Sequence, residues 1–197
     1  MYTDEQVVKL RNEYKAQLKK GENNELICQG QTIHLKEYLF FNDRLLIMLP
    51  SFFGPLDPKS IEIKYPSSNR PPIILSDKSE SINYTFNLLS QQPLSNEHVK
   101  EVANFFKQII RRTNPANVFF SEDVVTTQNC EIAYFEYKSY AIDQDVYNLV
   151  FVLAIDHQTL LGTFNCRFVD SKTWQPIVVE VLKTCKDLSL EKAGEKR

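Results

Sequence analysis

The segment from Lys64 to Pro72 is the part of the sequence whose residue types are best suited to binding a ligand. It combines two cations, Lys64 and Arg70, with the ring of Tyr65 and three prolines. Proline restricts its own backbone and that of the preceding residue, so the loop is stiff and presents side chains at a low entropic cost. Lys64, Tyr65 and Arg70 are therefore candidate ligand- or partner-binding residues. The alternative is that the loop only crosses from one sheet edge to the other.

Other residues that could take part in catalysis or metal binding have simpler structural explanations. Cys166 could act as a nucleophile beside a histidine, but it falls on the apolar face of a predicted strand, where a thiol is usually a core residue. Asp143 and Asp145 could hold a divalent cation, but they occur where a hairpin must turn, and aspartate is common in turns. We therefore predict no catalytic residue and no metal site.

A site assembled in space from distant segments is the alternative, and the protein would then bind a small ligand or be an enzyme. The three histidines are isolated in the sequence, so the paired spacing of a zinc site is absent. The candidate residues of an assembled site are Arg70, Tyr65, Asp143 and His157, from the proline-rich loop and two hairpin turns. They would have to converge on one deep pocket.

The glycines exclude the common phosphate-binding loops. Such loops need closely spaced glycines, so that backbone amides can approach the phosphate. The chain has only five glycines, and no two of them are within eight residues of each other. Neither a P-loop nor a dinucleotide-binding fingerprint is present, and there is no GxSxG nucleophile motif. We therefore predict a non-enzymatic protein with no cofactor.

Composition and charge argue against nucleic acid and a membrane as partners of this protein. The chain has 23 basic and 25 acidic residues, so it lacks the basic excess that phosphate contacts usually require in a nucleic-acid-binding protein. No apolar run is long enough to span a membrane, and the first residues do not read as a secretory signal. The four cysteines are widely spaced, which favours reduced, mostly buried thiols. We expect a cytoplasmic protein.

The N-terminal segment predicts a peripheral helix. Thr3 and Gln6 form a capping box, and the helix is expected to run to about Lys20, where Gly21 suits its C-terminal end. Its apolar stripe, which includes Leu10 and Tyr14, is narrow for a core helix. We therefore interpret this helix as one that lies on the domain or docks on a partner, with Leu10 and Tyr14 as candidate partner-binding residues.

The rest of the chain predicts one α+β domain over residues 26–188, between the N-terminal helix region (1–21) and a flexible tail (189–197). Apolar alternation and turn residues indicate the strands, and broad apolar stripes indicate two helices. Glu122 and Asp123 are expected in an exposed loop. The predicted strands are Thr32–Phe41, Leu45–Leu49, Ile61–Tyr65, Ser81–Leu88, Glu131–Ile142, Val146–Ile155 and Thr159–Phe168, and the helices begin at Ser95 and near Trp174–Pro176.

These elements predict a largely antiparallel sheet of six to seven strands with helices packed on it. The last three strands form a meander with short turns. The middle one, Val146–Ile155, is apolar at nearly every position, so both of its faces should be covered. The stripe of the last helix comprises Ile177, Val178, Val181, Leu182, Cys185 and Leu188. A two-sided central strand favours a three-layer α/β/α sandwich.

The order of elements from about Leu45 to Leu188 is distinctive, and its landmarks are Met48–Phe52, Tyr65-Pro66, Arg70-Pro71, the helix from Ser95, the meander ending in Gly162–Cys166, and Trp174. This order resembles the PsbP-like and DcrB-like α/β/α sandwich group. That group includes extrinsic subunits of photosystem II, bacterial lipoproteins and cytoplasmic chaperones for secreted effectors, and the resemblance implies protein binding without catalysis.

Our leading hypothesis is a non-enzymatic protein-binding module, a chaperone or adaptor, whose partner is another protein or a second copy of the chain. It predicts an exposed apolar or aromatic patch larger than a monomer normally shows. The rival hypothesis, a small-ligand-binding protein or an enzyme, predicts a pocket around residues 64–72 and the hairpin turns. Nucleic-acid binding would require a continuous positive face and ranks last.

Overall fold

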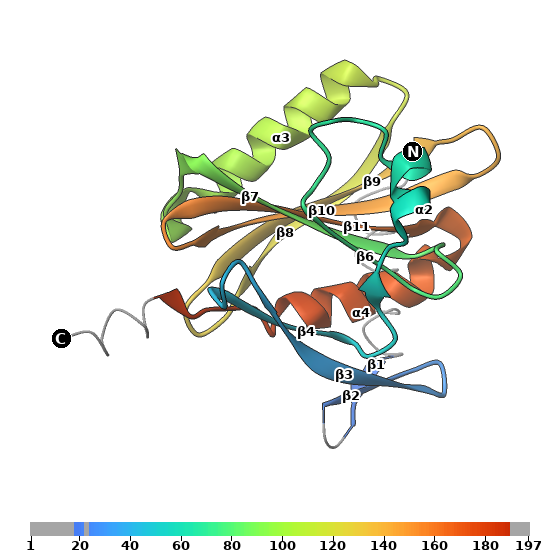
Figure 1. Cartoon of the computed structure of the whole chain (residues 1–197), viewed down its shortest axis with the longest axis horizontal. Helices are drawn as coiled ribbons and strands as arrows, with labels where there is room; N and C mark the ends of the chain where they lie inside the picture. The colour runs from blue at the N-terminus through green and yellow to red at the C-terminus, as the bar shows by residue number, and fades with distance from the viewer. Residues whose placement is uncertain (1–17, 22–23, 190–197) are drawn as a thin grey trace.

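The computed structural model describes residues 18–21 and 24–189, and within these ranges the fold is α+β, with two antiparallel sheets and three α-helices (Figure 1). The predicted fold class is therefore confirmed. Helix α3 (Val99–Thr113) covers one face of the larger sheet. Helix α4 (Ser171–Leu182) lies on the other face, between the two sheets, and α2 (Pro58–Lys64) lies near one end of the larger sheet (Figure 1).

The larger sheet has seven strands, and every pair of neighbours in it is antiparallel. The predicted meander forms strands β9, β10 and β11. Strand β10 is buried along almost its whole length, as its apolar sequence predicts. In spatial order the strands are β5 (Gly54–Pro55), β6 (Ile73–Ser76), β7 (Asn83–Pro93), β11 (Gln158–Arg167), β10 (Asp145–Ile155), β9 (Glu131–Tyr140) and β8 (Val118–Thr126).

The smaller sheet has five strands and contains the predicted hairpin of β3 and β4. The sequence indicates that hairpin, but not that it belongs to a second sheet. In spatial order the strands are β1 (Leu18–Lys20), β2 (Glu25–Cys28), β3 (Gln31–Phe40), β4 (Leu45–Pro50) and β12 (Lys186–Asp187).

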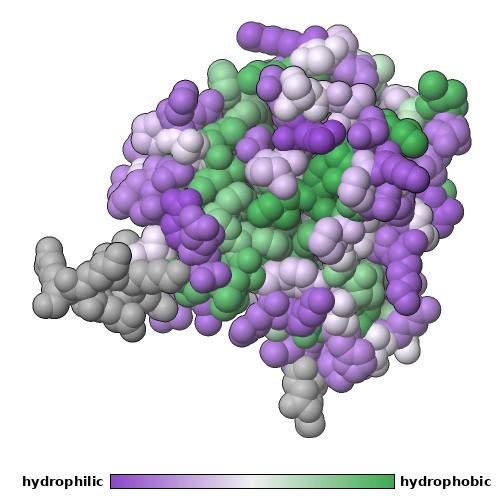
Figure 2. Space-filling view, in the orientation of Figure 1, coloured by the Kyte–Doolittle hydropathy of each residue, from purple (hydrophilic) through white to green (hydrophobic). Residues whose placement is uncertain are grey.

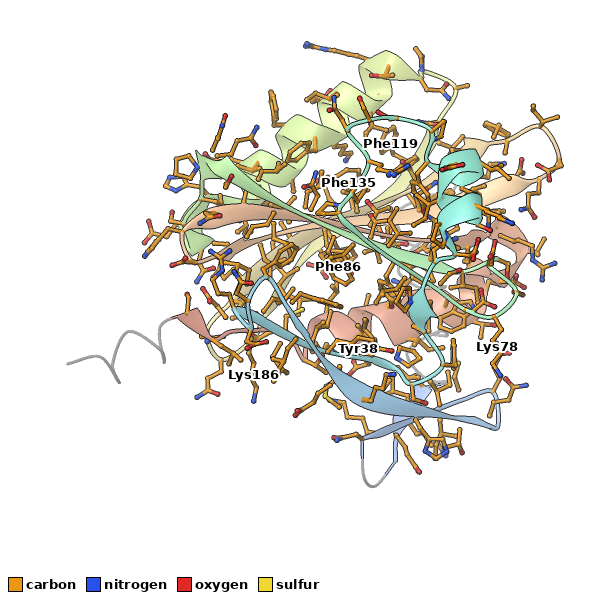
Figure 3. All side chains as sticks on the ribbon, viewed as in Figure 1. Tyr38, Lys78, Phe86, Phe119, Phe135 and Lys186 are labelled. Atoms are coloured by element: carbon orange, nitrogen blue, oxygen red, sulfur yellow. The ribbon has the colours of Figure 1, made fainter. Side chains whose placement is uncertain are left out.

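Two hydrophobic clusters hold these layers together. The first fills the space between the larger sheet, α4 and the smaller sheet, and it contains Phe86 of β7 together with buried residues of β4 and α4. The second lies under α3 and contains Phe135, with Phe119 packed against it. Figure 3 shows Phe119 and Phe135 on the α3 side of the sheet and Phe86 on the side that faces Tyr38 of the smaller sheet.

Several predicted elements differ from the structure. Residues predicted as a short strand, Ile61–Tyr65, belong largely to helix α2. The helix forms because Pro58 occupies its first turn and the carboxylate of Asp57 accepts a hydrogen bond from the Lys59 amide at 2.9 Å. Glu122 and Asp123 are not in a loop but in β8. Helix α4 ends at Leu182, so Cys185 and Leu188 follow it.

The N-terminal prediction is corrected where the structure describes it. Leu18–Lys20, predicted as the last turn of a helix, forms strand β1 and pairs with β2. The rest of that predicted helix, with Leu10 and Tyr14, lies outside the described residues, as do residues 190–197 of the predicted tail.

Candidate protein-binding surface

Two of the three candidate residues in the proline-rich loop fix the loop to the rest of the domain. Lys64 closes α2, and its ammonium donates a hydrogen bond to the Glu80 carbonyl oxygen at 2.6 Å and lies 3.1 Å from Glu80 Oε2. Tyr65 is half-buried and shares a side-chain hydrogen bond with Asn165; burial raises the pKa of its hydroxyl despite that bond. Arg70 is exposed. The loop is therefore anchored at its start, and Lys64 and Arg70 are exposed whereas Tyr65 is half-buried.

The four residues proposed for an assembled site do not converge. Tyr65 contacts Asn165 near the end of β11, whereas His157 lies in the turn just before β11. Eight residues of extended chain separate His157 from Asn165, which corresponds to roughly 26 Å. His157 and Tyr65 therefore lie at opposite ends of the sheet, and Arg70, Tyr65, Asp143 and His157 do not share one pocket.

The other residues singled out for chemistry have structural roles. Cys28, Cys130, Cys166 and Cys185 are all free and buried, and burial raises the pKa of the Cys166 and Cys185 thiols well above the usual range. Asp145 forms an ion pair with Lys138 at 3.1 Å. Within residues 18–21 and 24–189, no group of three or more His, Cys, Asp or Glu side chains could hold a metal ion.

A cleft of about 440 Å³ lies between α4 and strands β8 and β9. Its charged lining includes Lys20, Lys183 and Glu180. Lys20 Nζ lies 3.1 Å from Glu180 Oε2, and the Lys183 ammonium pairs with the other carboxylate oxygen of Glu180. Burial works against ionisation of Glu180, but the hydrogen bonds from Lys183 and Lys20 outweigh it and lower the pKa of the carboxyl. These charges are therefore paired with one another rather than directed at a ligand.

An aromatic surface lies at the end of the larger sheet where β9 and β11 finish. We define it by its hydrophobic side chains: Phe120, Tyr140, Ile142, Phe168 and Val169. Ile142, at the β9–β10 turn, is fully exposed, and Val169 is 78% exposed. Phe120 and Tyr140 are exposed by 42% and 50%. Exposed hydrophobic residues are ordinary when scattered singly, whereas contiguous apolar patches are typical of interaction sites, so this surface is a candidate for one.

Ring contacts and the Lys138 ammonium connect the three aromatic members of this surface, Phe120, Phe168 and Tyr140. The rings of Phe120 and Phe168 stack with centroids 5.8 Å apart, although they come from β8 and from the single-turn 3-10 helix Phe168–Asp170. Lys138 Nζ lies 4.4 Å from the Tyr140 ring centroid and 5.1 Å from that of Phe168. Hydrogen bonds with Tyr140 and Asp145 raise the pKa of Lys138, so a cation is held among the rings.

An irregularity in β8 places Phe120 on this surface. The pairing of β8 with β9 shifts register between Phe119 and Glu122. Phe119 packs under α3 with its ring 5.3 Å from that of Tyr137, while Phe120 turns to the opposite side of the strand. Ser121 then donates a hydrogen bond to the buried Glu136 carboxylate at 2.8 Å. The hydrogen bond to the buried Glu136 carboxylate thus stabilises the bulge.

Local patterns in the sequence do not reveal the aromatic surface. Its members come from two strands, a turn and a 3-10 helix, and they meet only when β8, β9 and the end of β11 are paired through β10. The available signals were Ile142 next to a polar hairpin turn and Val169 next to Asp170, because neither position is expected to be buried.

The fold of this chain is also found in solved structures of other proteins. No family model and no curated protein matches the sequence. Among solved structures, the chain is similar to the cyanobacterial PsbP protein (CyanoP) of Synechocystis sp. PCC 6803, with a TM-score of 0.57, 12% identity, and coverage of 78% of this chain and 92% of that one. It is also similar to the Ran-binding protein Mog1p of Saccharomyces cerevisiae, with a TM-score of 0.53, 10% identity, and coverage of 81% and 98%. The expected PsbP-like fold group is therefore confirmed.

Proposed function

We propose that the protein is a non-enzymatic protein-binding module and that the aromatic surface is its principal contact with a partner. The observation that carries this proposal is the exposure of Tyr140, Ile142 and Val169 at the end of the sheet where Lys138 Nζ lies 4.4 Å from the Tyr140 ring centroid. Aromatic side chains and cations are enriched at the energetically important centres of protein interfaces. Lys138 is already ordered by Asp145 at 3.1 Å, so its immobilisation adds little to the cost of binding.

The fold supports this proposal by analogy. Mog1p, which shares the fold, binds the protein Ran. Fold similarity alone does not transfer a function, so the role of a chaperone or adaptor rests on the surface itself. Arg70, Lys64, Tyr65, Leu10 and Tyr14 remain proposed secondary contacts, and of the three loop residues Lys64 and Arg70 are exposed.

The proposal includes a cytoplasmic location and, as one form of partner, a second copy of the chain. Four free, buried thiols suit a reducing compartment and support that location. Across the described ranges, none of the helices has the length and apolar character needed to cross a membrane.

The test is affinity purification of the tagged full-length protein, compared with the double variant Ile142→Asp/Val169→Asp. Both residues are exposed, so the variant is expected to fold normally, which circular dichroism checks. The matched control is Ile63→Asp, an equally apolar residue that is 80% exposed on α2. We expect one protein that co-purifies with the wild type and with the control to be lost from the double variant.

The partner identified in this way is then purified and titrated. An affinity reduced by about tenfold or more in the double variant, with the control unchanged, supports the proposal. Equal binding of all three proteins, or the absence of any protein that distinguishes them, contradicts it.

A further inference from the structure

We infer that the open half of strand β7, Asn87–Gln92, accepts an extended, uncharged segment of a partner protein as an additional strand. Strand addition uses the backbone hydrogen-bonding groups of an exposed sheet edge for affinity and the flanking side chains for specificity. This site is separate from the aromatic surface and does not depend on the function proposed for it.

Strand β7 is much longer than the neighbour that covers it. It runs from Asn83 to Pro93, whereas β6 pairs only with Asn83–Phe86. On its other side, β7 pairs with β11 as far as Leu89 and again at Pro93, and Ser90–Gln92 form a bulge between the two. Within the described ranges, no strand pairs with Asn87–Gln92 on the β6 side.

Two prolines explain why β6 stops where it does. In the register of the pair, Ile73 lies opposite Phe86, so a longer β6 would place Pro72 opposite Asn87 and Pro71 opposite Leu88. Proline has no backbone N–H and cannot donate to a neighbouring strand. The proline-rich loop therefore ends the pairing and leaves the remainder of β7 uncovered.

The hydrogen-bonding groups of Leu88 point to the uncovered side. The Ile74 carbonyl accepts a hydrogen bond from the Leu56 amide at 3.0 Å, so the polar backbone groups of Ile74 face β5. Because these groups alternate along a strand, those of Ile73 face β7 and meet Phe86. Leu88 is two residues beyond Phe86 and points the same way. Its N–H and C=O are thus directed at the position of a missing strand.

The open edge lacks the features that normally prevent strand addition. Exposed edges are usually protected by charged side chains, especially lysine, or by a covering element. Residues 87–92 read Asn-Leu-Leu-Ser-Gln-Gln and contain no charge. Leu88 and Leu89 are half-buried, and Ser90–Gln92 are exposed. An uncharged segment would therefore meet no charged side chain on the strand itself.

Apolar residues lie on both sides of this edge. On α3, Lys107 and Arg111 face β8, since Lys107 pairs with Glu122 and Arg111 lies over Phe119. Phe105 and Ile109 project from the opposite flank of α3, toward β11 and β7, and are exposed. The half-buried Phe40 of the β3–β4 hairpin contacts Phe86 from the other face. Figure 2 shows hydrophobic surface on this side of the molecule, between α3 and the smaller sheet.

The dimensions of the edge favour a single peptide over a second copy of the chain. The proline-rich loop limits the open stretch at one end, and the register shift after Leu89 limits it at the other. The open stretch has three residues in the regular register, Asn87–Leu89, about 10 Å long, followed by the bulged residues Ser90–Gln92, and it fits one short extended segment. The occupant is expected to be uncharged, with apolar side chains directed both toward α3 and toward the β3–β4 hairpin.

The experiment selects phage-displayed octapeptides against the full-length protein. The recovered peptide is synthesised in two forms, one unmodified and one with N-methyl groups on alternate residues. N-methylation removes backbone donors but keeps every side chain, so strand addition predicts binding weakened by about tenfold or more. Equal binding of the two forms would overturn the inference, because the contact would then depend on side chains alone.

Protein variants locate the peptide. Ser90→Pro and Ser90→Lys both block the open edge at an exposed residue, and either is sufficient if the other fails to fold. We expect both to weaken peptide binding by about tenfold or more, while Val118→Lys on β8 and Ile142→Asp on the aromatic surface leave it unchanged. Loss with Ile142→Asp alone would assign the peptide to the aromatic surface. Self-association abolished by Ser90→Lys, seen by sedimentation, would assign the edge to a second copy. Either result, or failure to recover any peptide, contradicts the inference.

Discussion

Strand β8 ends the larger sheet on one side with several forms of edge protection, whereas the open half of β7 on the other side has none. Strand β8 carries Glu122 and Asp123 and a register irregularity after Phe119. Lys107 of α3 reaches over it to pair with Glu122 at 2.5 Å. Asn87–Gln92 of β7 has neither charges nor a covering helix side chain of this kind. Both edges belong to one sheet, so the difference lies in the local sequence rather than in the fold.

This difference indicates what each side of the molecule is suited for. A protected edge prevents non-specific pairing, and an unprotected one persists in a folded protein where pairing is useful. The bulge that protects β8 also directs Phe120 to the aromatic surface, so on that side the proposed binding groups are side chains. On the β7 side, the proposed binding groups are the N–H and C=O of the backbone.

The largest effect is expected at the centre of the sheet, on which both edges depend. A Cβ at Gly162 would lie 2.0 Å from Cζ of the buried Phe151 ring, directly opposite on β10. Gly162→Ala should lower the free energy of unfolding by about 2–3 kcal/mol, measured by urea denaturation. Hydrogen exchange should speed up in β7 and β8 alike.

The matched control for this change is Gly54→Ala, where a Cβ meets no atom within 4 Å. Its unfolding midpoint should stay the same or rise slightly. Equal effects of the two substitutions would show that Phe151 can move aside.

A smaller effect, confined to the β8 side, is expected for Tyr147→Phe. The buried Tyr147 hydroxyl donates a hydrogen bond to Glu136 Oε2 at 3.0 Å, and the same carboxylate holds Ser121 of the β8 bulge. Loss of a buried hydrogen bond to a charged group should cost about 1.5–2 kcal/mol. Hydrogen exchange should accelerate in β8 but not in β7. Tyr137→Phe, on the other face of β9, is the control, and equal acceleration in both variants would refute the role of Glu136.

The β7 side should respond instead to Asp77→Asn in the β6–β7 turn. The Asp77 carboxylate accepts hydrogen bonds from the amides of Ser79, Ser81 and Ile82 at 2.9–3.0 Å. Partial burial raises the pKa of Asp77, but the hydrogen bonds from Ser79, Ile82 and Ser81 outweigh it and lower the pKa below the usual value. Because the group is partly exposed, we expect a loss of only about 1 kcal/mol at neutral pH.

The pH dependence of this change has a definite sign. A lowered pKa in the folded state means that the stabilisation is complete above the unfolded pKa of about 3.9 and is lost as the pH falls through the folded value. The difference in unfolding free energy between wild type and Asp77→Asn should therefore shrink in acid. Asp143→Asn, in the exposed β9–β10 turn, is the control. A difference that grows in acid would contradict this account.

Glu122→Val is expected to have the smallest effect on stability but to increase self-association. An exposed ion pair contributes little, so the free energy of unfolding should change by less than about 0.5 kcal/mol. With the charge removed, β8 should self-associate more readily, which sedimentation velocity measures. Glu62→Val on α2 is the control for added surface hydrophobicity. A monomeric Glu122→Val protein would show that the bulge alone protects β8.

Much of the secondary structure could be predicted from local patterns. The alternation of Ile82, Tyr84 and Phe86 correctly indicated β7, but Asn83 and Thr85 are buried as well, because α3 and the proline-rich loop cover part of the second face. The alternation of Ile61, Ile63 and Tyr65 wrongly indicated a strand. In this segment, the N-cap at Asp57 and the proline at Pro58 stabilise a helix instead. The side chain of Ile63 is 80% exposed on that helix.

The sequence by itself determined the meander, the α3 helix, the buried thiols and the lack of phosphate-binding loops, because these depend on residue types within a few positions of one another. Only the tertiary structure decided that Phe120 stacks on Phe168. It also decided that β7 extends beyond the end of β6, so that the backbone groups of Leu88 face a position with no paired strand. Pro71 and Pro72 are visible in the sequence, but what they leave uncovered depends on their register against β7. Strand pairing joins residues far apart in the chain, and no local periodicity records it.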